Sequence, residues 1–547
     1  MKLEKTQTIA TEVLVIGGGG AGLRAAIEAR KNGSEVLLLS LSRAGYGNNT
    51  AISMGMFAAS SGTRDPRDNP GVHLQDTVVS GRYMNNQVLA EVMAEGAWQQ
   101  VKDLEEMGVE FKKSGSQTWI MHVPGHTYPR HVSANRTLGA EFTLPMRRYA
   151  EEAGVRFLEG VQVTKLLVSH GGVSGVTGID TLGNLYVIYA GATVLASGGA
   201  GEVFLRTNNA AGSTGDGIAL CYGSGLPLVD MEFVQFYPTT LGEYGSRVWA
   251  YEVTLGRGAT LRNSLGEDIL EKHNLKNFMT MTRDRLARAI MLEILDGHDI
   301  DGKMAADFSI MPDDLLEKMH RINKNLRYPE KAMVAPAAHY FMGGVDININ
   351  TETALNNLFV AGELCGGIHG ANRLTGNAIT DIFVFGAIAG RQAARLKGGK
   401  SGEAEVSVEE EAGRLQGILD RKGRENLETC SRGLRETMWK KAGIIRTSES
   451  LKEALGEVTA GQNRIKQVPA DNPRDLIKLL KLENMLLVSE MVCKAAIMRA
   501  ESRGSHYRTD FPGEDNGEWL KNIFITSKNN EMELAARPVA FTKISPQ

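Results

Sequence analysis

The sequence predicts an α/β protein whose first domain is a Rossmann-like nucleotide-binding domain. An apolar run of strand length at 13–16 leads into a glycine-rich loop at 17–22, and an alanine-rich helix follows. A second apolar run at 35–39 has the length of a neighbouring parallel strand. This order of strand, loop, helix and strand is the βαβ unit that binds a nucleotide where its helix begins. Later strand-like runs at 192–196 and 358–361 also lead into glycines, as expected of loops that return to a bound cofactor.

The glycine loop is the most informative segment of the chain. Gly17 allows the tight turn, Gly19 lets the backbone approach a pyrophosphate, and Gly22 lets the helix pack against the strand. Free N–H groups at the helix start, together with the helix dipole, favour a phosphate there. We therefore expect a nucleotide at this loop, with Gly20 and Ala21 beside it in the first helical turn.

Length and composition restrict the class of protein. A chain of 547 residues exceeds one hydrophobic core, so several domains are expected. A net charge of −3 gives no reason to expect nucleic acid as a partner. The four cysteines show no CxxC spacing, which argues against an iron–sulfur cluster, a zinc site or any other metal within the chain. With neither a signal peptide nor an apolar span, we expect a cytoplasmic protein that meets a membrane only through partners.

The pattern of predicted elements divides the chain into five parts. A flexible linker is expected at 397–402, and single helices at 86–107 and 145–153. The parts are the nucleotide-binding domain, first part, 1–225; an inserted α+β domain, 226–345; the nucleotide-binding domain, second part, 346–400; a helical domain, 403–505; and an irregular, polar C-terminal tail, 506–547.

Four glycine motifs recur in order along the chain, at 17–22, 196–199, 214–217 and 361–364. A large flavin cofactor requires contacts from segments late in the chain as well as from the first glycine loop. Enzymes that bind only NAD seldom need the third and fourth returns. The spacing of the motifs therefore favours a flavin dinucleotide.

At this point the chain resembles the flavoprotein subunits of the succinate dehydrogenase and fumarate reductase family, with L-aspartate oxidase as a close relative. The resemblance runs from about residue 12 to residue 512. It implies FAD, a capping domain at 226–345 over the flavin, and a helical domain behind it. The motifs that carry it are HYFMGG at 339–344, GANRL at 370–374 followed by Asn377, TRDR at 282–285 and ESRGSH at 501–506.

The resemblance also implies which residues hold FAD. Ser40 ends the second strand, where an acid commonly binds the adenosine ribose, so a serine contact is expected there. Glu363 matches the carboxylate that holds the ribityl hydroxyls. The full expected set is Gly17, Gly19, Gly20, Ala21, Gly22, Ser40, Asn49, Thr50, Gly55, Ala196, Ser197, Gly198, Asp216, Glu363, Arg373, Asn377, Ala378 and Ile379.

Catalysis in the resembled family transfers a hydride between flavin N5 and a carbon next to a carboxylate, while a proton moves on the opposite face. Arg373 and His339 match the residues that clamp one substrate carboxylate, a task that suits the guanidinium fork. Arg283 matches the proton donor and acceptor, and Glu252 matches its relay carboxylate. Because arginine rarely deprotonates, that role requires a close relay.

Asn49 is the first departure from the family pattern. It takes the place of the histidine that bonds covalently to the flavin in respiratory members. Asparagine cannot form that bond, so FAD is expected to be non-covalent. A covalent histidyl link raises the flavin potential. A lower potential is therefore expected here, one less suited to oxidising succinate.

The other departures concern the substrate and the proton. Tyr237 replaces a histidine and Tyr251 replaces the usual threonine at the substrate's far end, and neither brings a positive charge. Either the far end is an amide, a thioester or a larger group, or fumarate is retained despite drift. The second relay arginine aligns with Leu255, and Arg257 follows two residues later. The proton then comes from a shifted Arg257 or by another route, through Tyr251.

These residues predict an FAD-dependent oxidoreductase that acts on a carbon–carbon bond alpha,beta to a carboxylate. The chain has no cluster ligands and no heme motif, so the resemblance implies that its electron partner is a separate iron–sulfur subunit. Two alternatives stay open. One is an aspartate-oxidase-type enzyme without a partner, which the ending at 502–507 and the absent flavin link resemble. The other is a non-catalytic flavoprotein that relays electrons within a complex.

Overall fold

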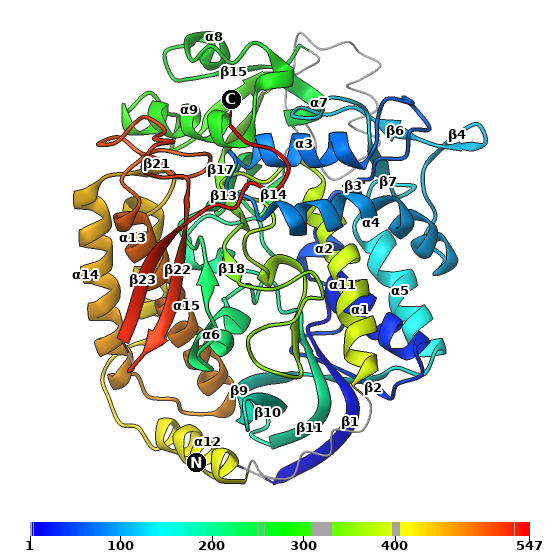
Figure 1. Cartoon of the computed structure of the whole chain (residues 1–547). Helices are drawn as coiled ribbons and strands as arrows, with labels where there is room; N and C mark the ends of the chain where they lie inside the picture. The colour runs from blue at the N-terminus through cyan, green and yellow to red at the C-terminus, as the bar shows by residue number, and fades with distance from the viewer. Residues whose placement is uncertain are drawn as a thin grey trace.

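A seven-stranded sheet forms one end of the molecule in the computed structural model (Figure 1). Its order is β8-β2-β1-β11-β10-β9, with β19 paired to β11. The pairs that involve β1, β2, β8 and β19 are parallel, whereas β9, β10 and β11 pair antiparallel. The strand bounds are β1 Thr6–Ile16, β2 Val36–Ser40, β8 Arg156–Glu159, β9 Val161–Ser169, β10 Gly172–Asp180, β11 Leu185–Leu195 and β19 Leu358–Val360. The structure describes residues 3, 5–248, 251–255, 258–307, 331–396, 405–529 and 531–546.

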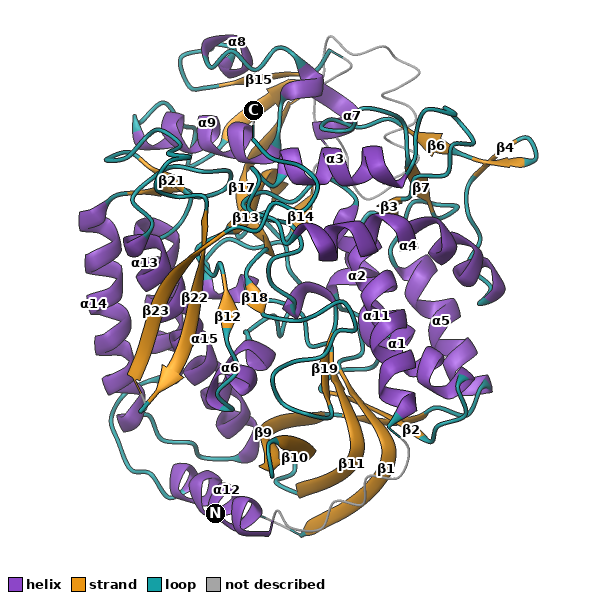
Figure 2. Cartoon of the chain, viewed as in Figure 1, coloured by secondary structure: helices purple, strands orange, loops and turns teal. Residues whose placement is uncertain are grey.

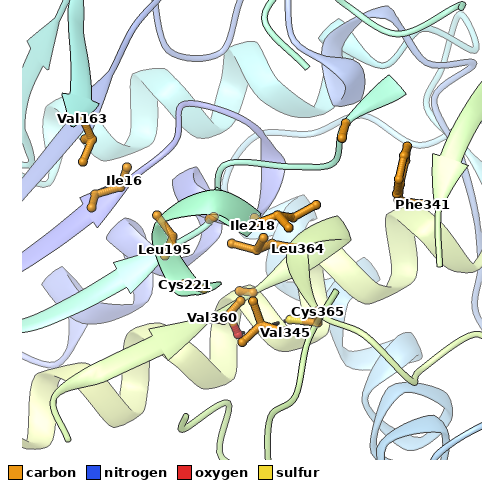
Figure 3. Packing of buried hydrophobic residues seen from close by; sticks show 14 of the residues in the cluster. Ile16, Val163, Leu195, Ile218, Cys221, Phe341, Val345, Val360, Leu364 and Cys365 are labelled. Carbon is orange, nitrogen blue, oxygen red and sulfur yellow. Dashed lines mark hydrogen bonds between the residues drawn. The ribbon is translucent and has the colours of Figure 1, made fainter. Parts of the chain in front are cut away.

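The parallel strands form because their sequences are continuously apolar. All five residues of β2 are buried, as are the last four residues of β1, which is the pattern of strands covered on both faces. The predicted strands at 13–16 and 35–39 are thus confirmed. Ile16, Val163 and Leu195 belong to one buried cluster near the carboxyl ends of β1 and β11 (Figure 3).

Helices α1 and α11 pack closely against one another because two glycines of α11 face α1. A Cβ at Gly386 would lie 2.8 Å from the carbonyl oxygen of Ala21, and one at Gly390 would lie 2.2 Å from that of Ala25. Figure 2 shows this pair with α4 and α5 on one side of the molecule. The helix bounds here are α1 Gly20–Lys31, α3 Pro70–Ser80, α4 Gln87–Glu106, α5 Ala140–Glu152 and α11 Asn377–Arg395.

Two predicted helices can be compared with this group. The helix predicted at 86–107 is confirmed as α4, whose N-cap Asn86 accepts a hydrogen bond from the Leu89 amide. The helix predicted to begin at Pro145 begins earlier, at Ala140. Pro145 lies inside α5 because Phe142 and Met146, one turn apart, are both buried and hold the first turn in place.

A second sheet, of five strands, lies at the opposite end, within the predicted range 226–345 (Figure 1). Its order is β14-β13-β17-β16-β15. Its elements are β13 Val234–Leu241, β14 Arg247–Val248, α7 Tyr251–Thr254, β15 Thr260–Arg262, α8 Ile269–Lys272, α9 Arg283–Leu295, β16 Met304–Asp307 and β17 Lys331–Phe341. The domain boundaries themselves stay predictions, and the expected linker at 397–402 lies outside the described residues.

Four helices follow in the range predicted to be helical, and three of them, α13 to α15, lie side by side in Figure 2. Helix α15 is the longest, with 26 residues, and begins at Pro473 behind the N-cap Asn472. Within the described ranges, no helix is both long and apolar enough to cross a bilayer. The bounds are α12 Glu405–Leu419, α13 Leu427–Lys441, α14 Ser448–Arg464 and α15 Pro473–Met498.

The remaining elements are short segments that join these parts. They are α2 Asn49–Ile52, β3 Met56–Ala58, β4 Lys113–Ser114, β5 Gln117–Thr118, β6 Ile120–Met121, β7 His131–Ser133, η1 Gly201–Val203, α6 Asp216–Gly223, β12 Leu228–Val229, η3 Phe278–Thr280, β18 Gly344–Val345, η4 Gly362–Leu364, β20 Ile445–Arg446, η5 Ile465–Gln467 and β21 Tyr507–Arg508.

The prediction of an irregular C-terminal tail is wrong. Lys521–Lys528 (β22) and Glu531–Pro538 (β23) pair antiparallel, and β22 also pairs with β12. Alternate residues of β22 are buried, with Ile523 and Ile525 fully inaccessible, which is the period of a strand with one covered face. The alternation of apolar and polar residues in β22 is short, and charged residues flank it. The segment therefore has the composition of a polar loop, and the sequence does not predict a strand there.

We expect Ile525→Ala to loosen the hairpin. Truncating a buried isoleucine costs about 2–5 kcal/mol, so amides of β22 should exchange with solvent at least about tenfold faster. Hydrogen exchange followed by mass spectrometry measures this. Lys528→Ala, at an exposed position of the same strand, is the control. Rapid exchange of 521–528 already in the wild type would contradict the pairing.

Candidate active site

A cavity of about 210 Å³ lies where β1, β2 and β11 end and α1 begins. Polar edges of loops from distant parts of the chain surround it, as expected of the nucleotide crevice in such sheets. Twelve of the residues predicted to bind the cofactor line it. They are Gly17, Gly19, Gly20, Ala21, Ser40, Asn49, Thr50, Ala196, Ser197, Gly198, Asp216 and Glu363.

The glycine loop fits a dinucleotide for steric reasons. Gly17 has a φ of 119°, and a Cβ there would lie 2.2 Å from the Ala196 carbonyl oxygen. A Cβ at Gly22 would lie 1.8 Å from the Gly17 carbonyl oxygen, so the helix can pack only on glycine. At Gly19 the opposite holds, because a Cβ would meet no described protein atom within 3.8 Å and its nearest neighbours are at 3.9 Å. The space beside Gly19, in front of the first N–H groups of α1, is open to a ligand.

Three polar side chains in the cavity have defined hydrogen-bonding states. The Ser40 hydroxyl donates to the Ser42 carbonyl at 2.6 Å, so its oxygen is left to accept from a ribose hydroxyl. Asn49 accepts from the Ala210 amide at 2.7 Å. Glu363 accepts from the Phe341 amide at 3.1 Å, and burial raises the pKa of its carboxyl to about 7.

Six of the residues predicted to bind the cofactor do not line this cavity: Gly22, Gly55, Arg373, Asn377, Ala378 and Ile379. The Asn377 side chain instead bonds to the His73 ring and to the Thr77 hydroxyl, each at 2.9 Å. Four polar residues that do line it were not predicted, namely Ser42, Asn48, Gln162 and Ser213. Asn48 could have been found, since it is the N-cap of α2 directly before Asn49.

The predicted catalytic side chains form a second, buried cluster. Arg283, the first residue of α9, donates to Glu252 of α7 with its Nη2 3.1 Å from the carboxylate. Burial alone would lower the pKa of Arg283, but the negative Glu252 and two neighbouring phenols outweigh it, so the pKa is raised. Arg373 has no carboxylate within ion-pair distance among the described residues. Burial and the nearby Arg283 lower the pKa of Arg373 to about 9.

Gln235 joins the two arginines, and it was not predicted. Its Oε1 accepts from Arg283 Nη1 at 3.2 Å and from Arg373 Nη2 at 2.9 Å. Its Nε2 donates to the Asn372 side chain and to the Arg373 carbonyl, both at 2.9 Å. A signal was present in the sequence, because Gln235 precedes Tyr237 by two residues on β13 and therefore shares its face of the sheet.

His339 lies between this cluster and the cofactor cavity. Its Nδ1 is 3.1 Å from the Asn208 side-chain oxygen, and Asn209 donates to its carbonyl at 2.9 Å. The next residue, Ala210, bonds Asn49 in the cavity, so one short segment reaches both sites. Burial, with Arg283 and Arg373 nearby, holds the pKa of His339 well below its usual range, and the ring is neutral.

Both departures at the substrate's far end are buried in the same cluster. The Tyr237 ring lies 5.3 Å from His339 and 5.8 Å from Tyr251, centre to centre. The Tyr237 hydroxyl donates to Glu252 at 2.5 Å. Leu255 packs in the apolar cluster with both tyrosines and cannot carry a proton, whereas Arg257 lies outside the described residues.

The ESRGSH motif at 501–506 forms a buried ion network, and its Ser505 bonds to the carbonyl of Ala371, two residues before Arg373. Glu501 accepts from Arg499 at 3.0 Å and from Arg503 at 2.8 Å, and Arg499 also bonds Glu232 at 2.7 Å. All four side chains are essentially inaccessible. The motif therefore links the C-terminal part to the rest of the fold. Its resemblance to aspartate oxidases reflects this structural role and does not indicate an aspartate oxidase activity.

The sheet, the glycine loop and the cavity define a protein that binds a dinucleotide. An FAD-binding domain profile matches residues 12–379, and a profile for the C-terminal part of fumarate reductase flavoproteins matches residues 431–547. The chain belongs to the fumarate reductase and succinate dehydrogenase flavoprotein family, whose members are FAD-dependent oxidoreductases.

Individual relatives match along almost the whole chain. An uncharacterized FAD-dependent oxidoreductase of Methanocaldococcus jannaschii is 36% identical, over 95% of this chain and 96% of its own. One of the subunits of the fumarate reductase (CoM/CoB) of Methanothermobacter marburgensis is 35% identical, over 94% and 97%. The solved Escherichia coli quinol fumarate reductase flavoprotein superposes with a TM-score of 0.92 at 26% identity, over 99% and 98%.

Glu363 predicts that FAD binding depends on pH. Its pKa without cofactor is about 7, and ribityl hydroxyls would donate to the charged form. Binding then favours the charged carboxylate, so affinity should fall as pH drops below 7, by up to about tenfold per pH unit for one proton. Titration of apoprotein with FAD at pH 6, 7 and 8 measures this. Glu363→Gln should bind more weakly and lose the dependence, and an unchanged profile in that variant would contradict the role.

Proposed function

We propose that this protein reduces, or reversibly oxidises, a carbon–carbon double bond alpha,beta to a carboxylate. The observation that carries the proposal is the buried cluster in which Gln235 bridges Arg283 and Arg373, beside Glu252. Two buried guanidinium groups within reach of one oxygen are costly unless an anion joins them. A site that only relays electrons has no use for such an arrangement.

Arg373 and His339 would hold the substrate carboxylate. Among the described residues, Arg373 has a buried Nε without a hydrogen-bond partner, and no carboxylate lies within ion-pair distance of it. A pKa of about 9 keeps it protonated at neutral pH, and a bound carboxylate would stabilise that charge. His339 is neutral without substrate and donates its single N–H from Nδ1 to the Asn208 oxygen. It would add a hydrogen bond from Nε2 after taking up a proton, which a bound carboxylate would favour.

Arg283 would give the proton to the substrate carbon. Its raised pKa keeps it charged at neutral pH, and its Nε is also buried without a partner among the described residues. The Glu252 carboxylate lies between Arg283 and the Tyr237 hydroxyl. This chain of hydrogen bonds supplies a relay that does not need the arginine missing at position 255.

FAD would lie in the cavity beside the glycine loop, with Ser40 toward its ribose and Glu363 toward its ribityl hydroxyls, and it would supply the hydride. We infer that FAD is bound non-covalently. Asn49 occupies the position of the linking histidine in the resembled family, and its amide already bonds Ala210.

Electrons would reach the flavin through a partner. Several relatives are named as subunits of larger enzymes, which supports an assembly for this chain as well. An iron–sulfur subunit would carry the electrons, and any membrane contact would be made through such partners at a cytoplasmic face. Isolation from the native source tests this: co-purifying iron supports it, and a pure protein without iron contradicts it.

We expect Arg283→Lys to lower turnover by about 10²–10⁴-fold, the usual contribution of a positioned acid. Lysine keeps the charge but loses the fork that contacts Glu252 and Gln235 together. Steady-state enoate reduction with a reduced dye measures it, with FAD content as a check. Arg288→Lys, the same change on the same helix at a residue that stacks on Tyr507, is the control. Near wild-type turnover in Arg283→Lys would refute the proton role.

Acid denaturation should release all of the FAD. Precipitated protein would be colourless, the supernatant would hold one FAD per chain, and no fluorescent band would remain on a denaturing gel. These results follow because asparagine offers no nucleophilic ring nitrogen at position 49. A fluorescent protein band would show a covalent link formed elsewhere.

A further inference from the structure

The hydrogen-bonding state of Tyr237 is fixed by Glu252. A carboxylate can only accept, so the 2.5 Å contact uses the single phenolic proton of Tyr237. Burial, and then the negative Glu252, raise the pKa of Tyr237 well above its usual range, so the phenol stays neutral. Toward any further ligand, the Tyr237 oxygen can therefore only accept a hydrogen bond.

Tyr251 has the complementary state. Tyr251 is fully buried, and burial together with the negative Glu252 raises its pKa well above the usual range, so the phenol keeps its proton. No described residue accepts that proton in a hydrogen bond, and the neighbouring Arg283, a guanidinium, can only donate. The Tyr251 proton is then left to donate. The two phenols, with rings 5.8 Å apart, thus offer one acceptor and one donor side by side.

The charges of the two arginines, Glu252, His339 and the two tyrosines add to plus one, and the adjacent Asp284 is bonded to Asn372. Arg283 and Glu252 form an ion pair and cancel. His339 and both tyrosines are neutral. The remaining charge is that of Arg373, which the described residues leave without a carboxylate partner. The next carboxyl, Glu363, faces the cofactor cavity.

A dicarboxylate does not suit this arrangement. One carboxylate would bind Arg373, but the other would face the Tyr237 oxygen, so that two hydrogen-bond acceptors would oppose one another. The charge of the nearby Arg283 is already neutralised by Glu252. A buried charge without a partner costs several kcal/mol. A primary amide avoids both penalties, since it is neutral and its N–H and C=O groups match the two phenols.

We propose that the substrate is a monoanionic enoate whose far end is a primary carboxamide, with its N–H donating to Tyr237 and its carbonyl accepting from Tyr251. This inference rests on the function proposed above. The reaction adds one hydride from reduced FAD and one proton across the C=C bond. The product is the saturated amide acid, two electrons leave the cofactor, and the amide itself is unchanged.

Three probes of almost equal size test it: fumarate, its monoamide and its monomethyl ester. The fully reduced FAD-loaded protein is mixed with each probe without oxygen, and flavin reoxidation is followed. We expect the monoamide to exceed fumarate in kcat/KM by about 10–100-fold at pH 7.5, the range given by mismatched polar groups. The ester, a monoanion with no N–H, should fall between them.

The pH dependence of the ratio is a second readout. Protonated hydrogen fumarate is a monoanion with a donor and an acceptor at its far end, and it mimics the amide. The monoamide-to-fumarate ratio should therefore fall as the pH is lowered from 8 toward the carboxyl pKa, by at most about tenfold for each pH unit. Effects of pH on the enzyme common to both probes cancel in the ratio.

Variants place the effect on the two tyrosines. Tyr237→His supplies a donor and should shift the preference toward fumarate at least tenfold. Tyr251→Phe should lower kcat/KM for the monoamide without raising kcat/KM for fumarate. Tyr244→His, at an exposed tyrosine of the same region, is the control. If the Tyr237→His variant fails to bind FAD, the monoamide-to-fumarate ratio of the wild-type protein and the pH dependence of that ratio still test the proposal.

The outcomes separate the two proposals. Fumarate equal to or better than the monoamide, with a ratio independent of pH, overturns this inference and leaves the proposed function in place. An ester equal to the monoamide overturns the amide assignment. Failure of all three probes to reoxidise the flavin overturns the proposed function and this inference together.

Discussion

One amide oxygen, that of Gln235, lies between two buried guanidinium groups, and the active site depends on it. Arg283 and Arg373 repel one another, and burial deprives both of water. The oxygen accepts a hydrogen bond from each, while the Gln235 amide nitrogen is held by Asn372 and by the Arg373 carbonyl. The two cations are thus fixed in relative position before any substrate carboxylate arrives, and no reorganisation is needed when charge develops there.

This arrangement is made by segments that are far apart in the chain. Gln235 and Tyr237 come from one strand of the second sheet, Arg283 begins α9, and Arg373 lies in the loop before α11. Asn372 also donates to Asp284 at 3.2 Å, which ties that loop to α9. Because α11 packs on α1 beside the nucleotide-binding sheet, the position of these two arginines is coupled to that of the cofactor cavity. The short segment 208–210 makes a second such link, through His339 and Asn49.

The sequence was sufficient for the nucleotide-binding part and for much of the site. Its strand and loop sequences are continuous and unambiguous, and the glycines have steric reasons that any such loop shares. Gln235 was missed because its role depends on two arginines brought together only by folding. The C-terminal hairpin was missed because its period-two pattern is short and polar. Asn377 was assigned to the cofactor, yet its side chain is used by His73 and Thr77, a contact across 300 residues of sequence.

The departures from the family pattern are understood best as changes of charge and of hydrogen-bond direction. Replacing a histidine by Tyr237 removes a donor and a potential cation, and Glu252 then takes the only phenolic proton. The most direct test of the central claim is one anaerobic turnover of the reduced holoprotein with an alpha,beta-unsaturated carboxylate. Our account predicts one saturated product for each flavin reoxidised. Reoxidation no faster than in buffer, with every such acid, would contradict it.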